Sequence, residues 1–339
     1  MDISKFNMFF RYCPFMKIQI IGLGNLGINL LKIIHQKKRL IKKLFGENIE
    51  ITSISDSKGT LILDGISLIN IVKLKKSDRL KDLDAFEKIN ALKAIEEIKA
   101  DAVVELTLST QTGFPGIEYA IKAFENNKDV ITANKSILTS DKINIIKKAN
   151  EMNRILKYDA TVCGSIPVFS LLDYSLIPAK IIKIEGLFNA TTTYIISRIE
   201  NGLEKEKAIS DAIKLGISEK NINDDLFGID SARKGIILHR RIFNSDLSLK
   251  DVNIKIKNNY INIGHRQMTI INKDNVVVKN YNIKNKKIYN YYEGASMNIK
   301  FYTDLFDTLS LGVKFDGAYE SASSVFNDIL LTLKERKKF

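Results

Sequence analysis

Four carboxylates lie within twelve residues of the second half of the chain, beside two glycines. They are Glu219, Asp224, Asp225 and Asp230, and Lys234 follows them. A loop this dense in charge suits capture of an ammonium or a hydroxyl group better than it suits packing. Asp230 and Lys234 stand four apart at the start of a predicted helix and share a face, so a simple surface ion pair is the alternative interpretation.

Lys135 is a second candidate for proton transfer. It ends the segment ITANK, which follows a predicted buried strand at the edge where open α/β sheets bind ligands. A lysine there acts as a general acid or base when burial and neighbouring cations lower its pKa, and Asn134 offers both a donor and an acceptor. The alternative is one solvated lysine among many.

The histidines His35, His239 and His265 lie outside these clusters, so we expect no histidine relay.

A glycine-rich turn is the third chemical signal. A predicted strand at 17–21 runs into GLGNLG, and apolar residues at helical spacing follow. This context favours binding of a dinucleotide pyrophosphate at a helix N-terminus over a bare structural turn. Asp56, after the second strand, suits the ribose hydroxyls of NAD, whereas Lys58 suits the 2′-phosphate of NADP. The predicted cofactor site comprises Gly22, Gly24, Asn25, Leu26, Gly27, Asp56 and Lys58.

Strands and helices alternate through the first half of the chain. Strands are predicted at 51–54, 102–106, 129–132 and 155–158, with helices at 84–99, 114–126 and 141–152. This order predicts an α/β fold, a Rossmann-type doubly wound parallel sheet with helices on both faces. Beyond residue 160 we expect a mixed α+β domain. Its predicted elements are a strand at 181–188, helices at 192–201, 204–215 and 231–244, and hairpins within 253–292.

The predicted domain division is discontinuous. Residues 16–157 and 304–339 form the dinucleotide-binding domain, completed by an amphipathic helix at 321–333, and residues 158–303 form the substrate-binding and dimerisation domain. Residues 1–15 lack the apolar run and cleavage site of a signal peptide, so we interpret them as an extension or a misplaced start.

Composition excludes several functional classes. The chain has 339 residues, 52 Lys plus Arg against 39 Asp plus Glu, a net charge of +13 and two cysteines, Cys13 and Cys163. Two cysteines supply neither a disulfide framework nor a four-cysteine zinc site, which indicates a reduced, cytoplasmic protein. Apolar stretches are too short to span a membrane. The basic residues are spread along the chain, so we expect no nucleic-acid face.

Together these motifs resemble the homoserine dehydrogenase family, in a monofunctional form without an aspartokinase or ACT domain. The resemblance runs in order from residue 16 onward. Its pieces are GLGNLG (22–27), ISDSKG (54–59), VELT (104–107), TGFP (112–115), ITANK (131–135), YDATV (158–162), GLFNATTTYI (186–195), EKNINDDLFGIDSARK (219–234), NIKFYTD (298–304) and SASSV (321–325).

The resemblance implies interconversion of L-homoserine and L-aspartate 4-semialdehyde with NAD or NADP, in threonine and methionine biosynthesis, by a homodimer. It makes Lys135 and Lys234 the candidates for proton transfer, with each lysine lowering the pKa of the other. Asp230 would hold the substrate and orient Lys234. Further substrate contacts are implied for Glu219, Asp225 and Thr191, and Thr107 and Asn134 would lie by the nicotinamide.

Two segments depart from the family pattern. The loop after Tyr158 resembles a monovalent-cation site, which nominates Asp159, Val162 and Gly164 for sodium, although Asp159 is shorter than the family glutamate. Tyr319 stands at a glycine position before the last helix, where it would narrow the cofactor site. Two other functions stay open: another Rossmann oxidoreductase acting on an amino acid or its semialdehyde, and a basic nucleic-acid-binding protein.

Overall fold

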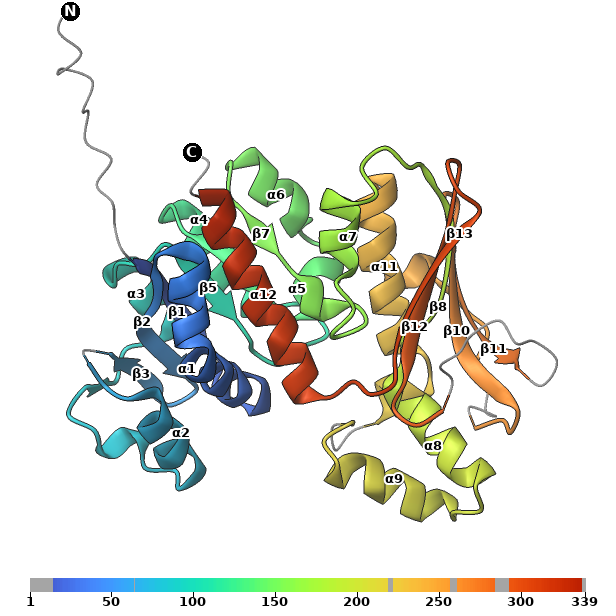
Figure 1. The fold of residues 1–339 in the computed structure, drawn as a ribbon, viewed down its shortest axis with the longest axis horizontal. Coiled ribbons are helices and arrows are strands. Elements are labelled where there is room, and N and C mark those ends of the chain that lie inside the picture. The colour runs from blue at the N-terminus through green and yellow to red at the C-terminus, as the bar shows by residue number, and fades with distance from the viewer. Residues whose placement is uncertain (1–14, 64, 219–221, 257–260, 284–292, 337–339) are drawn as a thin grey trace, which may run out of the picture.

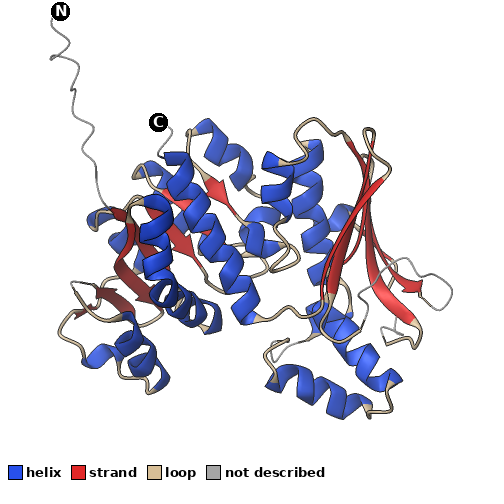
Figure 2. Cartoon of the chain, viewed as in Figure 1, coloured by secondary structure: helices blue, strands red, loops and turns tan. Residues whose placement is uncertain are grey.

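A computed structural model describes residues 15–63, 65–218, 222–256, 261–283 and 293–336. Two sheets organise the chain, each with helices packed against it (Figure 1, Figure 2). The first sheet has the strand order β4-β3-β2-β1-β5-β6-β7. Its described strand pairs are parallel except β2–β3 and β3–β4, because β3 runs opposite to the others. Its strands are β1 (Phe15–Ile21), β2 (Asn48–Asp56), β3 (Gly59–Ile62), β4 (Phe86–Glu87), β5 (Ala102–Glu105), β6 (Asp129–Thr132) and β7 (Leu156–Lys157).

Helices cover both faces of this sheet because alternate strand residues are apolar on both sides. Ile18 and Ile20 of β1 pack with one set of helices, and Ile21 and Val103 pack with the other. The first set is α1 (Asn25–Phe45), α2 (Leu68–Lys76) and α12 (Ala318–Arg336), and the second is α3 (Ala91–Glu97), α4 (Gly116–Glu125), α5 (Lys135–Thr139) and α6 (Ile145–Glu151). A doubly wound sheet is therefore confirmed.

The C-terminal helix α12 returns to the first sheet, beside α1 (Figure 1). Val325 and Ile329 join the apolar cluster of α1 and β1. Near the end of α12, Arg336 forms ion pairs of 3.0 Å with Asp101 and 2.7 Å with Asp129. A helix that is distant in sequence thus completes the layer over β1.

The second sheet has the strand order β13-β12-β8-β10-β11-β9 and is antiparallel except between β9 and β11. Helices α8 and α11 pack on one of its faces (Figure 1). Its strands are β8 (Ile181–Leu187), β9 (Asn253–Ile254), β10 (His265–Asn272), β11 (Val276–Asn282), β12 (Met297–Thr303) and β13 (Thr308–Val313). The helices of this half are α7 (Val168–Tyr174), α8 (Ala190–Glu200), α9 (Lys205–Lys214), α10 (Asn223–Leu226) and α11 (Ile229–Phe243).

Two sequence expectations need correction. The helix predicted at 84–99 is only α3, because Phe86 and Glu87 pair with Leu61 and Thr60 at the sheet edge. The segment from residue 304 was assigned to the dinucleotide-binding domain, yet β13 pairs with β12 in the second sheet. The return to the first sheet therefore begins at α12, and the domain division otherwise remains a prediction.

No helix among the described residues is long and apolar enough to cross a bilayer.

Candidate active site

The glycine turn connects β1 to α1 in a conformation that only glycine accommodates easily. Gly22 has φ +100°, and its N–H donates to the Ser55 carbonyl at 2.9 Å. A Cβ at Gly22 would lie 2.6 Å from the Leu106 carbonyl oxygen, and one at Gly27 would lie 2.5 Å from that of Gly22. Gly24 caps α1 without a side chain, so the first-turn amides at Asn25 and Leu26 are available to an anion.

Beside this turn is a cavity of about 460 Å³. It lies where strand order reverses between β1 and β5, the position at which doubly wound sheets bind ligands. Its lining includes the predicted Gly22, Asp56, Lys58 and Thr107 together with Lys88, Asn90, Pro115 and Tyr119, which the sequence analysis missed. The missed residues follow β4 or lie at α4, and only tertiary structure brings them to the turn. The open space at Gly24 and this cavity fit a dinucleotide.

Asp56 and Lys58 both lie at this cavity but face different partners. The Asp56 carboxylate accepts from the Lys58 backbone N–H at 2.8 Å and pairs with Lys75 at 2.6 Å. Lys58 pairs with Asp78 at 2.5 Å on the exposed rim. Lys75 thus compensates the Asp56 charge, and Asp78 compensates the charge of Lys58 at the rim of the cavity.

The tyrosine expected to narrow the cofactor site does not line this cavity. The Tyr319 hydroxyl instead lies 3.4 Å from the Gln36 side chain on α1. Three exposed basic residues of α1 do not line this cavity either: Lys37, Lys38 and Arg39.

Two glycine variants separate steric from ligand effects at the turn. Gly27→Ala forces its Cβ against the Gly22 carbonyl, so we expect it to lower the free energy of unfolding by about 1–3 kcal/mol. Gly24→Ala meets no atom within 4 Å, so we expect normal stability but roughly tenfold weaker NADPH binding, because the Cβ occupies the space open to a pyrophosphate. Thermal unfolding and fluorescence titration with NADPH measure the two effects. Unchanged NADPH affinity in Gly24→Ala would place the pyrophosphate elsewhere.

A buried carboxylate organises the end of β5. Glu105 accepts from the Thr107 N–H at 2.9 Å, the Thr132 hydroxyl at 2.8 Å and the Asn134 amide at 3.5 Å, and it contacts the Thr107 hydroxyl. Burial raises the pKa of Glu105, although these hydrogen bonds oppose the shift. Asn134 in turn caps α5 by accepting from the Ser136 N–H at 3.1 Å. The predicted Thr107 and Asn134 are thus brought together by Glu105, which the sequence marks as a charge in an apolar strand and as part of the VELT motif.

Asp230 lies between the two candidate lysines. Its Oδ1 is 3.2 Å from Lys135 Nζ and its Oδ2 is 2.7 Å from Lys234 Nζ. Lys135 begins α5 beside the first sheet, whereas Asp230 and Lys234 share one face of α11. Lys135 is 95 positions from Asp230 and 99 from Lys234 along the chain, so only the fold brings it to the other two. Asp230 and Lys234 side chains are 12% and 11% exposed, which excludes the surface ion pair.

Asp230 changes the charge state that the sequence predicted for Lys234. Burial alone would lower the pKa of Lys234, but the attraction of Asp230 outweighs burial and raises it. Burial alone would raise the pKa of Asp230, but Lys135 and Lys234 lower it. The expected mutual depression of the two lysine pKa values is therefore wrong for Lys234, since the carboxylate between them compensates their repulsion. Lys234 Nζ also donates to the Phe188 carbonyl, which aims the ammonium group.

The predicted substrate residues lie around this cluster. Asn189, which the sequence analysis missed, donates to Asp225 at 2.6 Å and to Asp230 at 3.1 Å. Burial, and then the repulsion of Asp230, raises the pKa of Asp225. The Thr191 hydroxyl donates to the Ile217 carbonyl at 3.2 Å. Glu219 lies outside the described residues.

Asp224, the remaining carboxylate of the acidic loop, faces away from the lysine pair. It is half exposed and pairs with Arg233 at 2.7 Å. The acidic loop therefore divides, with Asp225 and Asp230 facing inward and Asp224 facing solvent.

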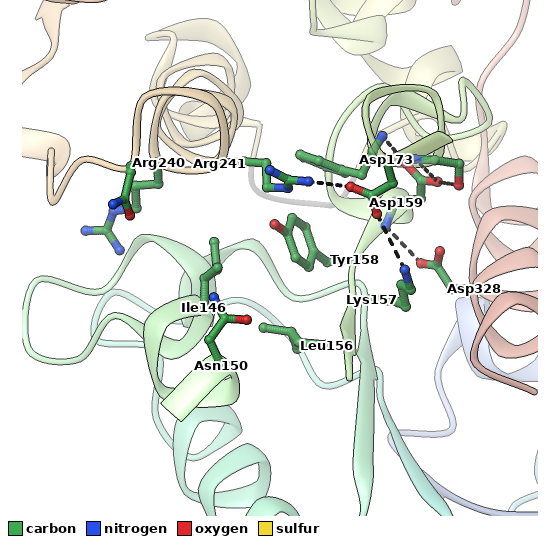
Figure 3. Close-up of a pocket in the computed structure, with 13 residues that line it drawn as sticks. Ile146, Asn150, Leu156, Lys157, Tyr158, Asp159, Asp173, Arg240, Arg241 and Asp328 are labelled. Atoms are coloured by element: carbon green, nitrogen blue, oxygen red, sulfur yellow. Dashed lines mark hydrogen bonds and ion pairs between the residues drawn. The ribbon is translucent and has the colours of Figure 1, made fainter. Parts of the chain in front are cut away.

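The predicted sodium ligands are engaged within the protein. Asp159 accepts from the Phe169 N–H at 2.6 Å and the Ser170 N–H at 3.2 Å, and so caps α7. The Gly164 carbonyl accepts from the Ser324 hydroxyl at 2.6 Å. Figure 3 shows Asp159 in a cavity of about 440 Å³ near Asp328, whose carboxylate accepts from the Asp159 N–H.

Two further carboxylates lie at this loop. Asp316 accepts from the Ser165 N–H at 3.2 Å, and Asp328 accepts from the Asp159 N–H at 2.8 Å. Across the described residues, no cluster of three His, Cys, Asp or Glu side chains suits a metal. Asp159 accepts from α7 and the Gly164 carbonyl accepts from Ser324, and sodium binding by Asp159, Val162 and Gly164 stays a prediction.

Comparisons with known proteins agree with this geometry. A family model described as homoserine dehydrogenase matches residues 167–330. The homoserine dehydrogenase of Methanocaldococcus jannaschii is 34% identical over 245 residues, covering 71% of this chain and 73% of that protein. The homoserine dehydrogenase of Pyrococcus horikoshii is 28% identical over 227 residues, covering 66% and 68%.

Solved structures resemble the whole fold. The homoserine dehydrogenase from Thermoplasma acidophilum superposes with a TM-score of 0.84 at 30% identity, covering 94% of this chain and 99% of that one. A hyperthermophilic archaeal homoserine dehydrogenase in complex with NADPH gives a TM-score of 0.80 at 25% identity, covering 95% and 98%. The similarity therefore includes both sheets and the helices that carry the lysine pair.

Proposed function

The chain belongs to the homoserine dehydrogenase family, and on that basis we propose how its residues divide the work of the reaction. The protein is an NAD(P)-dependent oxidoreductase that interconverts L-homoserine and L-aspartate 4-semialdehyde. One observation carries the assignment of roles: Asp230 holds Lys135 and Lys234 at 3.2 Å and 2.7 Å in a largely buried cluster. This family membership supports an oxidoreductase over the alternative of a basic nucleic-acid-binding protein.

Lys234 moves the proton in this proposal. The bound dinucleotide supplies or accepts the hydride at the substrate carbon. Because its pKa is raised, Lys234 carries a proton at neutral pH and donates it from Nζ to the aldehyde oxygen during reduction. In the oxidation direction the same Nζ must first lose its proton, so homoserine oxidation rises toward alkaline pH. The Phe188 carbonyl and Asp230 orient Nζ in both directions.

Asp225 and Lys135 bind the substrate in this proposal. Asp225 and Asp230 provide carboxylates for the substrate ammonium group, with Asn189 fixing both. Lys135, whose side chain is 27% exposed, presents a cation toward the substrate oxygen or carboxylate. Thr107, which lines the cavity, would contact the nicotinamide, and Asn134 and Glu105 hold it in place.

A steady-state assay tests this function directly. Purified protein is mixed with L-homoserine and either NAD or NADP across a range of pH, and reduced cofactor is followed by absorbance. We expect turnover with at least one cofactor and a rate that rises with pH. No turnover with homoserine, combined with turnover of a different amino alcohol in a substrate panel, would support the other Rossmann oxidoreductase.

We further propose that NADP is preferred over NAD. Lys58 and Lys88 line the cavity, and Lys75 pairs with Asp56. In this proposal the exposed Lys58 exchanges its partner Asp78 for the 2′-phosphate of NADP. We expect Lys58→Ala to lower kcat/KM for NADP about tenfold relative to NAD, because a charge-assisted contact to the 2′-phosphate is lost. Arg79→Ala is the control, since Arg79 is exposed, pairs with Asp82 and does not line the cavity. An equal fall with both cofactors would contradict the preference.

Homodimer formation through the second sheet is also proposed. Leu187, Met268, Ile270 and Tyr281 form an apolar cluster separate from the core that contains Ile271. Because Ile270 and Ile271 point to opposite faces, this cluster lies on the face away from α11. Leu187 and Met268 are buried within the chain itself, so Ile270 and Tyr281 supply the accessible part of this face. Light scattering should give twice the mass of the chain.

We also propose that the enzyme works in the cytoplasm, in threonine and methionine biosynthesis.

A further inference from the structure

The helix that carries Lys135 is too short to hold its own position. α5 spans Lys135–Thr139, barely more than one turn. A helix of this length is unstable without tertiary contacts, because its few hydrogen bonds do not offset the conformational entropy lost on nucleation. The separation between Lys135 and Asp230 must therefore be set by whatever anchors the two ends of α5.

We propose that Arg240 is a positioning residue that clamps the far end of α5 onto α11 and so holds Lys135 at its working distance from Asp230. This inference rests on the proposed function of Lys135 and Asp230. It adds a residue that lies outside the cofactor cavity and touches none of the reacting groups.

The contacts of Arg240 support a clamp. Its Nη1 donates to the Leu138 carbonyl at 2.9 Å and its Nη2 to the Ser140 carbonyl at 3.0 Å, both at the C-terminal end of α5. Its Nε donates to the Leu247 carbonyl at 2.9 Å, which fixes the guanidinium against the segment after α11. Arg240 is only 5% exposed. A single planar group thus satisfies three carbonyls from two parts of the chain.

The clamp acts on the lysine cluster through α11. Arg240 lies six residues after Lys234 on this helix, which also carries Asp230. A rigid helix transmits the position of Arg240 to Asp230. At the other end of α5, Asn134 is held by Glu105 from β5. Lys135 is therefore tied to the first sheet through Glu105 and to α11 through Arg240.

The neighbouring Arg241 provides a matched comparison. Figure 3 shows the two side chains leaving α11 in opposite directions, Arg241 toward Asp173 and Arg240 away from it. Arg241 forms an ion pair with Asp173 and its side chain is 39% exposed. It has the same charge and the same helix as Arg240 but makes no described contact with α5.

The experiment compares Arg240→Met with Arg241→Met. We expect Arg240→Met to lower kcat for homoserine by about 10- to 100-fold, since misplacement of a reacting group by about 1 Å has effects of this size. The dissociation constant for NADPH should stay within about twofold, because the cofactor cavity is not touched. Arg240→Lys, which keeps the charge and one carbonyl contact, should recover part of kcat. Arg241→Met should match the wild type.

Hydrogen exchange gives a readout independent of activity. Mass spectrometry should show faster exchange in residues 134–141 of Arg240→Met, with no change there in Arg241→Met and none over α4 in either variant. Should Arg240→Met fail to fold, Arg240→Lys is measured by the same criteria, with a smaller loss of kcat expected.

The proposal is overturned if kcat stays within twofold of Arg241→Met, or if NADPH affinity falls as much as kcat. If the wild type does not turn over homoserine, the proposed function fails, whereas hydrogen exchange in 134–141 still decides whether Arg240 holds α5. The clamp is rejected, independently of which substrate the enzyme uses, if hydrogen exchange in 134–141 is unchanged in Arg240→Met. If Arg240→Met does not fold, the same criterion applies to Arg240→Lys.

Discussion

Lys234→Ala is expected to lower kcat for homoserine about 10³-fold while leaving NADPH binding within twofold of the wild type. The loss has this size because Nζ of Lys234 is the proposed proton donor, and positioned acid–base groups contribute about 10²- to 10⁴-fold. Cofactor affinity is spared because Lys234 lies on α11 and does not line the dinucleotide cavity.

Kinetics and fluorescence titration on the same preparation measure the two effects. Lys250→Ala is the control, since this lysine is 75% exposed and pairs with Asp141 at the surface. Lys234→Met, which keeps the apolar stem, distinguishes loss of the amine from loss of packing. A variant without the amine that retains more than a tenth of wild-type kcat would transfer the proton role to Lys135.

Asp230→Asn has the second largest expected effect, and it acts on pH dependence as well as rate. The near-isosteric amide removes the charge that outweighs burial at Lys234, so the pKa of Lys234 falls. Homoserine oxidation requires the deprotonated amine, so its alkaline rise should move to lower pH. We also expect kcat at its optimum to fall about 10²-fold, because Lys135 and Lys234 lose their common partner.

The measurement is a pH profile of kcat for oxidation in the wild type, Asp230→Asn and Asp224→Asn. Asp224 belongs to the same acidic loop but pairs outward with Arg233, so its variant should keep the wild-type profile. A profile of Asp230→Asn that shifts to higher pH, or stays in place, would show that Lys234 is not the titrating group.

The elements that position the cofactor were predictable because their signals are local. A strand, three glycines at fixed spacing and an apolar helix are adjacent in sequence, and the steric demand at Gly22 and Gly27 follows from backbone geometry alone. The amphipathic pattern at 321–333 likewise predicted a helix, and α12 does return to the first sheet. Residue types, too, identified Lys135, Asp230 and Lys234 individually.

Long-range partners were not predictable in the same way. Lys88 and Tyr119 reach the cofactor cavity only because β4 and α4 pack around its edge. Phe86 lies in an edge strand although the pattern at 84–99 predicts a helix, because pairing with β3 satisfies its backbone N–H and C=O groups. The contact of the Asp159 carboxylate with the start of α7 likewise has no local signal, because Phe169 is ten residues further along the chain.

By itself, then, the sequence determined the fold class, the dinucleotide turn and the set of ionisable residues available for proton transfer. Only the tertiary structure decided their charge states and distances. Asp230 lies between two lysines from different parts of the chain, and it raises the pKa of Lys234, where the lysine pair implied by the family resemblance had predicted the opposite. The physical reason is that electrostatic interactions depend on separation and burial in space, and neither is encoded in local spacing.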